Sequence, residues 1–360
     1  MDAFIELIQT ALGVRDSVSV LPQTREEWEA LYSKAAKHNM LGLTFPVIDE
    51  IHDTVDIPLG VYSRWAMVTE KIQKKNAALV KACRQLSDMF LENGFRVCIM
   101  KGQAVAALYP RPELRHCGDI DLWVGGGREK VMDFLRPRFP MRKVLYIHAD
   151  VQMLKGIGTE VHFTPSWLNS PIGDRRLQKY FKSREEEQFG HFDRNLGFCT
   201  LTLEFDLVYM IQHIYRHVLE AGIGLRQLLD YYYVLKSASE EDMTRARQDL
   251  NHLRMMNFAA GVMYVLQEVF LLDKQHMIAD PDPVLGAFLL DEIMRSGNFG
   301  RYDSRNADPK TASQATHIKS KVTRALRFLK YFPSEVLWMP WFMTWQYFWR
   351  RRRGYLYKGR

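Results

Sequence analysis

Hydrophobic and polar residues follow a helical period over most of residues 1–92. Between about 62 and 91, apolar residues recur every three or four positions, with Lys, Arg and Gln between them, which is typical of an amphipathic helix. Thr24 and Glu27 have the spacing of a capping box, in which the threonine caps the helix and the glutamate reaches back to it. The pattern predicts an N-terminal helical segment over 1–92.

The pattern changes at Asn93-Gly94, where short apolar runs separated by turn residues begin. We expect strands at 95–100, 120–124, 143–154 and 159–164, the last two forming a hairpin. Helix-like stretches lie between them at 104–109 and 128–137. This alternation predicts a small α/β core over 93–168 with a mixed sheet.

The helical period returns from about Pro171 and predicts a larger C-terminal helical domain over 169–296. Its expected helices lie near 204–220, 224–237, 240–252, 255–271 and 282–295. A polar segment rich in Gly, Asn and Asp follows and predicts a linker over 297–317, before a basic aromatic tail over 318–360. The fold class is therefore α+β, with a small mixed sheet between N-terminal helices and the C-terminal helical domain.

Composition places the chain among globular proteins of a reducing compartment. It has 360 residues, of which 47% are hydrophobic and 25% charged, so wholly disordered and fibrous classes are excluded. The four cysteines show no CxxC spacing and are expected as reduced thiols. The first residues lack the basic region of a signal peptide, and no apolar run reaches the roughly 18–20 residues of a membrane span. We expect a cytoplasmic protein.

Basic charge is concentrated in the tail. Residues 318–360 hold eleven Lys/Arg and one acid, a net charge of +10, whereas the whole chain has +7, so the rest of the chain is slightly acidic. Charge alone therefore does not favour a nucleic-acid-binding body.

The sharpest chemical signal is Gly118-Asp119-Ile120-Asp121-Leu122. Two aspartates one residue apart on a strand point to the same face, where their repulsion favours a divalent cation such as Mg²⁺. An apolar strand ending in Lys101-Gly102 precedes them, and a glycine at a strand-to-helix turn lets backbone amides approach a phosphate. A bare pair of acids on a solvated strand is the structural alternative.

In combination these residues resemble the nucleotidyltransferase superfamily of DNA polymerase β, and more closely a bacterial family of uncharacterised nucleotidyltransferases. The resemblance covers about residues 25–300. It rests on Lys101-Gly102, Leu108-Tyr109-Pro110, Arg115, Gly118 to Asp121, Glu160-Val-His162-Phe, Pro165-Ser-Trp167, His213-x-x-Arg216-His217 and the stretch Gly222 to Asp230.

The resemblance implies two Mg²⁺ ions, with Mn²⁺ as an alternative, held by three carboxylates, and transfer of a nucleoside monophosphate from an NTP to an acceptor with release of pyrophosphate. Asp119 and Asp121 match the first two ligands, and Glu160, which opens the last predicted strand, is the expected third; an acid at a strand edge is the competing interpretation. Lys101, Gly102, Arg115 and Gly118 are the expected nucleotide-binding residues. Arg115 either binds phosphate or pairs with Asp119. The acceptor stays open: a small metabolite, a sugar, a protein side chain or an RNA end.

One residue departs from the superfamily pattern. Gln103 stands where the second small residue of the turn normally lies, which leaves open a catalytically weak protein that binds nucleotide as a sensor or assembly module. His213 and His217 have a spacing that would suit zinc, but structural hydrogen bonding is the preferred interpretation. Arg226 and Asp230 are most simply a helix ion pair.

The tail carries a second pattern. Trp338, Trp341, Trp345 and Trp349 form one helical stripe, followed directly by four arginines at 350–353. Such a stripe either contacts the headgroups of an anionic membrane, which would place the protein peripherally on its inner face, or packs on the helical domain. The sequence favours packing and leaves the membrane contact, centred on residues 336–360, as the alternative.

Overall fold

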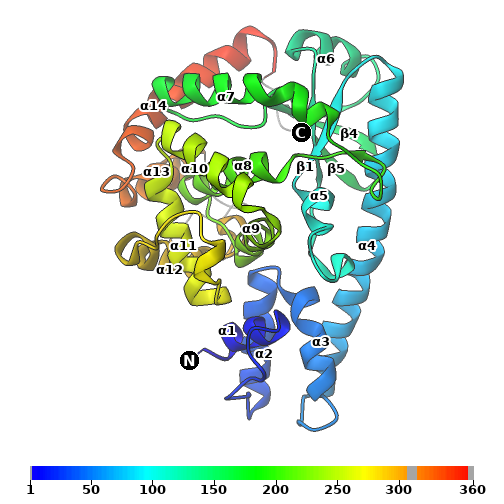
Figure 1. The fold of residues 1–360 in the computed structure, drawn as a ribbon, viewed down its shortest axis with the longest axis vertical. Coiled ribbons are helices and arrows are strands. Elements are labelled where there is room, and N and C mark those ends of the chain that lie inside the picture. Colours follow the sequence, from blue (N-terminus) through cyan, green and yellow to red (C-terminus); the bar gives the residue numbers. More distant parts are fainter. Residues whose placement is uncertain (1, 306–313, 356–360) are drawn as a thin grey trace. The chain divides into compact units, whose positions relative to one another are not determined.

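The computed structural model describes residues 2–305 and 314–355, and its chain is traced in Figure 1. The residues cluster into two compact units, each built from three separate stretches of the chain. The helical unit contains residues 1–76, 108–116 and 210–325, and the sheet unit contains residues 77–107, 117–209 and 326–360. The five consecutive segments expected from the sequence stay predictions of domain boundaries.

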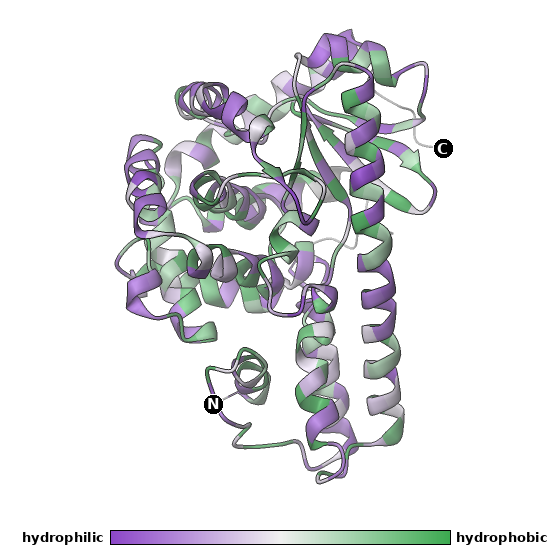
Figure 2. Ribbon diagram, turned by 45° about the vertical axis from the view of Figure 1, so that its right-hand side comes forward, coloured by the Kyte–Doolittle hydropathy of each residue, from purple (hydrophilic) through white to green (hydrophobic). Residues whose placement is uncertain are grey.

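The helical unit begins with α1 (Ala3–Ala11), α2 (Arg25–Lys37), α3 (Leu41–Ile51) and the first part of the long helix α4 (Leu59–Glu92). The capping box of α2 is present, because Thr24 Oγ1 accepts from the Glu27 amide and Glu27 Oε2 accepts from the Thr24 amide, both at 3.2 Å. The later elements of this unit are the end of α8 (Leu203–Glu220), α9 (Leu225–Ser237), α10 (Glu240–His252), α11 (Met256–Phe270), α12 (Pro283–Ser296) and most of α13 (Gln314–Arg327). Figure 2 shows hydrophobic and hydrophilic residues following one another along α4, as its helical period predicts.

The sheet unit is built on five strands in the order β1-β2-β5-β4-β3. The strands are β1 (Val97–Met100), β2 (Ile120–Val124), β3 (Met141–Val144), β4 (His148–Leu154) and β5 (Ile157–His162). Only the central pair β2–β5 is parallel, whereas β1–β2, β4–β5 and β3–β4 are antiparallel. The helices of this unit are α5 (Gly102–Ala106), α6 (Arg128–Leu135), α7 (Pro171–Gly190) and α14 (Pro333–Arg352), together with the second part of α4 and the start of α8. The expected α+β class with a small mixed sheet is confirmed.

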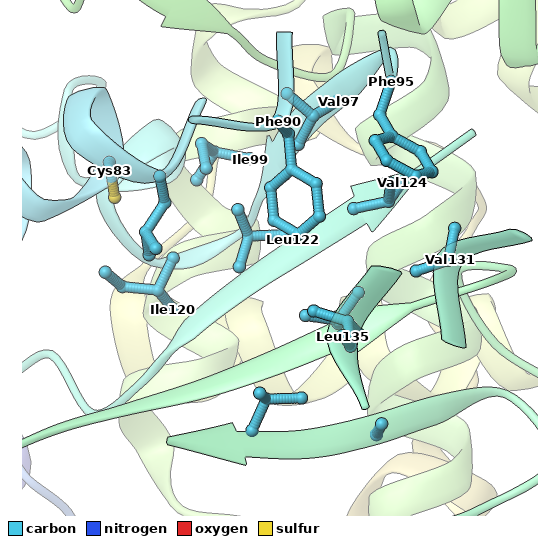
Figure 3. Close-up of a cluster of buried hydrophobic side chains, with 14 of the residues drawn as sticks. Cys83, Phe90, Phe95, Val97, Ile99, Ile120, Leu122, Val124, Val131 and Leu135 are labelled. Carbon is cyan, nitrogen blue, oxygen red and sulfur yellow. The ribbon is translucent and has the colours of Figure 1, made fainter. Parts of the chain in front are cut away.

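One face of this sheet forms the hydrophobic core of the unit. Ile120, Leu122 and Val124 alternate along β2 and are buried against Phe90 of α4 and Leu135 of α6. Figure 3 shows these side chains converging between the strands and the helices. Because side chains alternate along a strand, Asp121 and Trp123 must lie on the opposite face.

Three expectations need correction. The single strand expected at 143–154 is two strands, β3 and β4, because the chain turns at residues 145–147. The helix expected at 104–109 is the one-turn helix α5, and no pattern predicted the short hairpin of β6 (Phe192–Asp193) and β7 (Phe198–Cys199). The expected linker over 297–317 contains the 3₁₀ turn Asn298–Gly300 and the start of α13.

Within that expected linker, Asp303 is buried and Arg305 donates to both Asp303 and Glu292, so this part belongs to the packed helical unit. The remainder of the linker, 306–313, and the tail residues 356–360 with Lys358 and Arg360 lie outside the described residues. None of the helices in the described stretches combines the length and apolar character needed to cross a bilayer.

Candidate active site

Asp119, Asp121 and Glu160 lie on the sheet face opposite the core, which we call the site face. Asp121 of β2 pairs in register with Glu160 of the parallel strand β5, and cross-strand partners point to the same side of a sheet. Asp119 precedes Asp121 by two residues and lies beside Gly158 of β5, where a Cβ would come 3.4 Å from the Asp119 Cβ. Two neighbouring strands thus bring three carboxylates together.

Lys101 is fixed beside these carboxylates by an unusual backbone. It follows the last residue of β1, Met100, which pairs with Asp121, and its φ of 52° is rare for a residue with a side chain. Its Nζ lies 3.2 Å from Asp121 Oδ1 and 5.9 Å from the ring centroid of Tyr209. Backbone strain of this kind costs about 1–3 kcal/mol and persists where the surrounding structure holds it, often at functional sites.

Two histidines complete the site face. His148 of β4 pairs with His162 of β5. Two residues further along β4, Asp150 pairs with Glu160. The Nε2 of His162 lies 3.1 Å from Asp121 Oδ1 and 3.4 Å from Glu160 Oε2.

The other histidine approaches the same glutamate. His148 Nε2 is 3.1 Å from Asp150 Oδ1 and 3.8 Å from Glu160 Oε2. Glu160 therefore stands between two buried imidazoles.

Charges and burial set the protonation of this cluster. Burial raises the pKa of Asp119 to about 6, with help from the negative charges of Asp121 and Glu160. Burial alone would also raise the pKa of Asp121, but the Lys101 ammonium and the His162 hydrogen bond outweigh it and lower that pKa. For Glu160 the hydrogen bond and charge of His162 and the charge of His148 outweigh burial, so its pKa is lowered as well. Of the three carboxylates, Asp119 is therefore the one whose negative charge is least offset by neighbouring positive groups and hydrogen bonds.

A pocket of about 280 Å³ opens beside the carboxylates. Asp119 and Glu160 line it, together with Asp150 and Gln152 of β4 and Arg142 of β3. Two of the three expected carboxylates are therefore accessible to a ligand, in a pocket that also offers a guanidinium and an amide.

A family model described as "Uncharacterised nucleotidyltransferase" matches residues 24–271. The chain belongs to this nucleotidyltransferase family. A search of curated proteins finds no match. Among solved structures, an antigenic nucleotidyltransferase-like protein from Paracoccidioides brasiliensis is similar, with 13% sequence identity, a TM-score of 0.33, and coverage of 57% of this chain and 95% of that chain.

The family match includes every residue that the sequence singled out as part of the nucleotidyltransferase site, but the structure groups only some of them. Lys101, Gly102, Gly118, Asp119, Asp121 and Glu160 belong to the sheet unit. Gly102 has a φ of 42° and begins α5, and Gly118 is exposed immediately before Asp119. Gln103 is buried in α5.

Arg115 belongs to the helical unit and makes a different contact from those expected. Its Nε and Nη2 donate to Asp230 Oδ1 and Oδ2 at 2.7 and 2.8 Å, a bidentate pair buried from solvent. The Tyr109 hydroxyl and Arg226 donate to the same carboxylate, at 2.6 and 2.9 Å, so the expected Arg226–Asp230 pair is confirmed. The assignment of Arg115 to phosphate stays a prediction without a contact that favours it.

His213 and His217 stack edge to face in α8, with ring centroids 4.3 Å apart. Among the described residues, the group of His, Cys and carboxylate side chains close enough to hold a metal consists of His148, Glu160 and His162 instead. Local patterns in the sequence assigned none of the side chains of His148, His162, Asp150 and Arg142 to the site.

Proposed function

We propose that this nucleotidyltransferase transfers a nucleoside monophosphate from an NTP to an acceptor hydroxyl and releases pyrophosphate, with Mg²⁺ bound by Asp119, Asp121 and Glu160. The observation that carries the proposal is the register of β2 and β5, which sets Asp121 beside Glu160 on the site face, with Asp119 beside Gly158 two residues earlier. Membership of the family supports the reaction class.

The three carboxylates have the ligand chemistry of a hard divalent cation, although their oxygens do not all lie within 4.8 Å of one another, so binding one ion would require their side chains to move closer. Carboxylate oxygens are the ligands that Mg²⁺ prefers, and Asp119 and Glu160 open into a pocket from which an ion can enter. The Lys101 ammonium offsets part of the negative charge of Asp121. The pKa of Asp119 stays raised by burial and by the charges of Asp121 and Glu160, so a cation that binds there would relieve uncompensated negative charge. When bound, Mg²⁺ would neutralise part of the negative charge of the phosphates and lower the pKa of the acceptor hydroxyl.

The side chains of the site face have separable tasks in this reaction. The acceptor oxygen forms a bond to the α-phosphorus while the bond from that phosphorus to the bridging oxygen of the pyrophosphate breaks. Glu160 takes the hydroxyl proton, and His162 and His148 keep its carboxylate in position. In this proposal Lys101, which lies next to Asp121, binds triphosphate oxygens as a point charge.

The test is incubation with each labelled NTP, Mg²⁺ and a cell extract, followed by identification of the labelled product and measurement of pyrophosphate. The Asp119→Asn variant should lose labelling, whereas Asp133→Asn, a change in α6 on the core side of the sheet, should keep it. Equal labelling by both variants would refute the assignment of Asp119.

A second candidate function is nucleotide binding without transfer, as a sensor or assembly module. It is favoured by Gln103, which is buried at the turn where the superfamily has a small residue. Saturable binding of Mg-NTP with no pyrophosphate release, and with no labelled product from any extract, would select this function over transfer.

A further inference from the structure

The last helix, α14, has one face packed into the sheet unit. Its buried residues are Glu335, Val336, Met339 and Phe342. Phe342 stacks on Trp167 with ring centroids 6.0 Å apart, and Glu335 accepts hydrogen bonds from the amides of Asn169 and Ser170 at 2.6 and 3.1 Å. Packing therefore fixes how the helix is rotated.

The tryptophan stripe is divided along the length of the helix. Trp345 contacts Tyr146 at 5.1 Å between ring centroids, and Trp349 lies under the Arg128 guanidinium at 4.5 Å and beside Tyr355. Packing, the interpretation that the sequence favoured, thus accounts for the second half of the stripe, although the partners belong to the sheet unit and not to the helical unit. Trp338 and Trp341 are exposed.

The opposite side of α14 is an exposed apolar face, which we define by Leu337, Trp338, Trp341 and Phe348. Leu337 is 69% exposed, and Trp341 and Phe348 are each 50% exposed. Their spacing of four and then seven residues places them on one side of the helix. Nine of the nineteen large hydrophobic side chains exposed in the described residues lie between 318 and 348, so apolar surface is concentrated at this end of the chain.

Positive charge borders the apolar face. Arg351 and Arg352 are exposed in the last turn of α14, and Lys330, which precedes the helix in the same unit, is exposed as well. Residues 318–360 contain one acid, Glu335. Its side chain is buried and accepts hydrogen bonds from two backbone amides. Within this stretch no exposed acid offsets the basic residues, and from outside it Glu129 of α6 lies 3.6 Å from Arg353.

We propose that α14 binds the surface of an anionic lipid bilayer, lying in the interface plane with Leu337, Trp341 and Phe348 among the upper acyl chains and the arginines at the headgroups. This inference goes beyond nucleotidyl transfer and does not depend on it. Tryptophan prefers the headgroup region, and an amphipathic helix with basic flanks binds anionic interfaces through both apolar burial and charge. Single-stranded nucleic acid would use aromatic and basic residues but gains nothing from Leu337.

The experiment is flotation of the full chain with phosphatidylcholine vesicles and with vesicles that also contain phosphatidylglycerol. We expect binding to the anionic vesicles, at least tenfold weaker binding to the neutral ones, and loss of binding as salt is raised, because charges at a surface are screened within about 10 Å at 0.1 M salt. Tryptophan emission should shift to the blue on binding and be quenched by brominated acyl chains.

Two variants separate the apolar and the charged contributions. Trp341→Glu and the pair Arg351→Glu with Arg352→Glu should each lower vesicle partitioning by about tenfold or more. Ile172→Glu, at an apolar position on α7 that is 67% exposed, is the matched control and should partition like wild type. An unchanged thermal midpoint in all variants shows that folding is intact.

Equal partitioning of wild type and Trp341→Glu would overturn the proposal. Binding to single-stranded RNA or DNA with the same sensitivity to Trp341→Glu, together with no binding to anionic vesicles, would overturn it as well.

Discussion

Lys101 Nζ lies 3.2 Å from Asp121 Oδ1, so one carboxylate of the site carries its own counter-ion and its neighbour Asp119 does not. The two aspartates carry the same side chain but differ in environment, since Asp121 is buried and also contacts His162, whereas Asp119 lines the pocket. Their substitutions should therefore affect activity alike and stability differently.

Asp119→Asn and Asp121→Asn should each reduce Mg-NTP-dependent activity to background. Asp119→Asn should leave the thermal midpoint unchanged or raise it, because it removes repulsion from Asp121 and Glu160. Asp121→Asn should lower it, because the half-buried Lys101 loses its ion-pair partner and the buried His162 loses one of its two carboxylates. Scanning calorimetry of both variants beside the wild type checks this, and equal midpoints for the two variants would contradict it.

Arg115→Ala should destabilise the helical unit by about 3–5 kcal/mol, since it leaves the Asp230 carboxylate buried with fewer donors. Arg115→Lys should recover part of this loss but not the bidentate geometry. Urea denaturation provides the measurement, and Arg111→Ala, which removes an exposed arginine near the same turn, is the control.

The same pair of variants tests the nucleotide assignment of Arg115. If this residue contacts only Asp230, the folded Arg115→Lys protein should bind Mg-NTP as wild type does. If the Arg115→Lys protein is fully folded but binds Mg-NTP more weakly than the wild type, the assignment of Arg115 to phosphate would be supported.

Acid should destabilise the helical unit through His38. Burial lowers the pKa of this fully buried imidazole to about 3, and its Nδ1 accepts the Leu225 amide. Because the unfolded chain takes up the proton at its ordinary pKa of about 6.5 and the folded chain does not, stability falls as pH drops below that value. Between pH 7 and pH 5 the loss from this residue is about 2 kcal/mol.

Chemical denaturation across this range should show a shallower pH dependence for His38→Asn than for the wild type, whereas His52→Asn, at a less buried histidine, should match the wild type. A His38 ring resonance that titrates near pH 6.5 in the folded protein would refute the prediction.

Two phenylalanines of α14 offer a matched comparison of its faces. Phe342 is 8% exposed and stacks on Trp167, so Phe342→Ala should cost about 3–5 kcal/mol of unfolding free energy. Phe348→Ala should stay within about 0.5 kcal/mol because its side chain is largely in solvent. Denaturant titration distinguishes the two, and similar costs would mean that the helix is rotated differently.

Local patterns in the sequence were sufficient for the capping box of α2, for most helices and for the shared face of Asp119 and Asp121, because each depends on residues a few positions apart. The partner of Arg115 could not be predicted, since Asp230 lies 115 residues away and no local pattern indicates it. The position of His148 beside Glu160 depends on strand pairing and on a register shift between Val151 and Leu154, neither of which periodicity determines. The rotation of α14 depends in the same way on Trp167 and on the amides near Ser170.

The division of the chain into interleaved stretches has a consequence for its synthesis. Strands β1 and β2 belong to the sheet unit, yet the chain between them passes through residues 108–116 of the helical unit, and α14 is added from residues 326–355. Neither unit can therefore be expressed as one continuous fragment, and neither is complete on the ribosome when residue 209 emerges. All three carboxylates of the site face have been translated once residue 160 is added. The sheet unit is completed only by residues 326–360, which are synthesised after the last stretch of the helical unit.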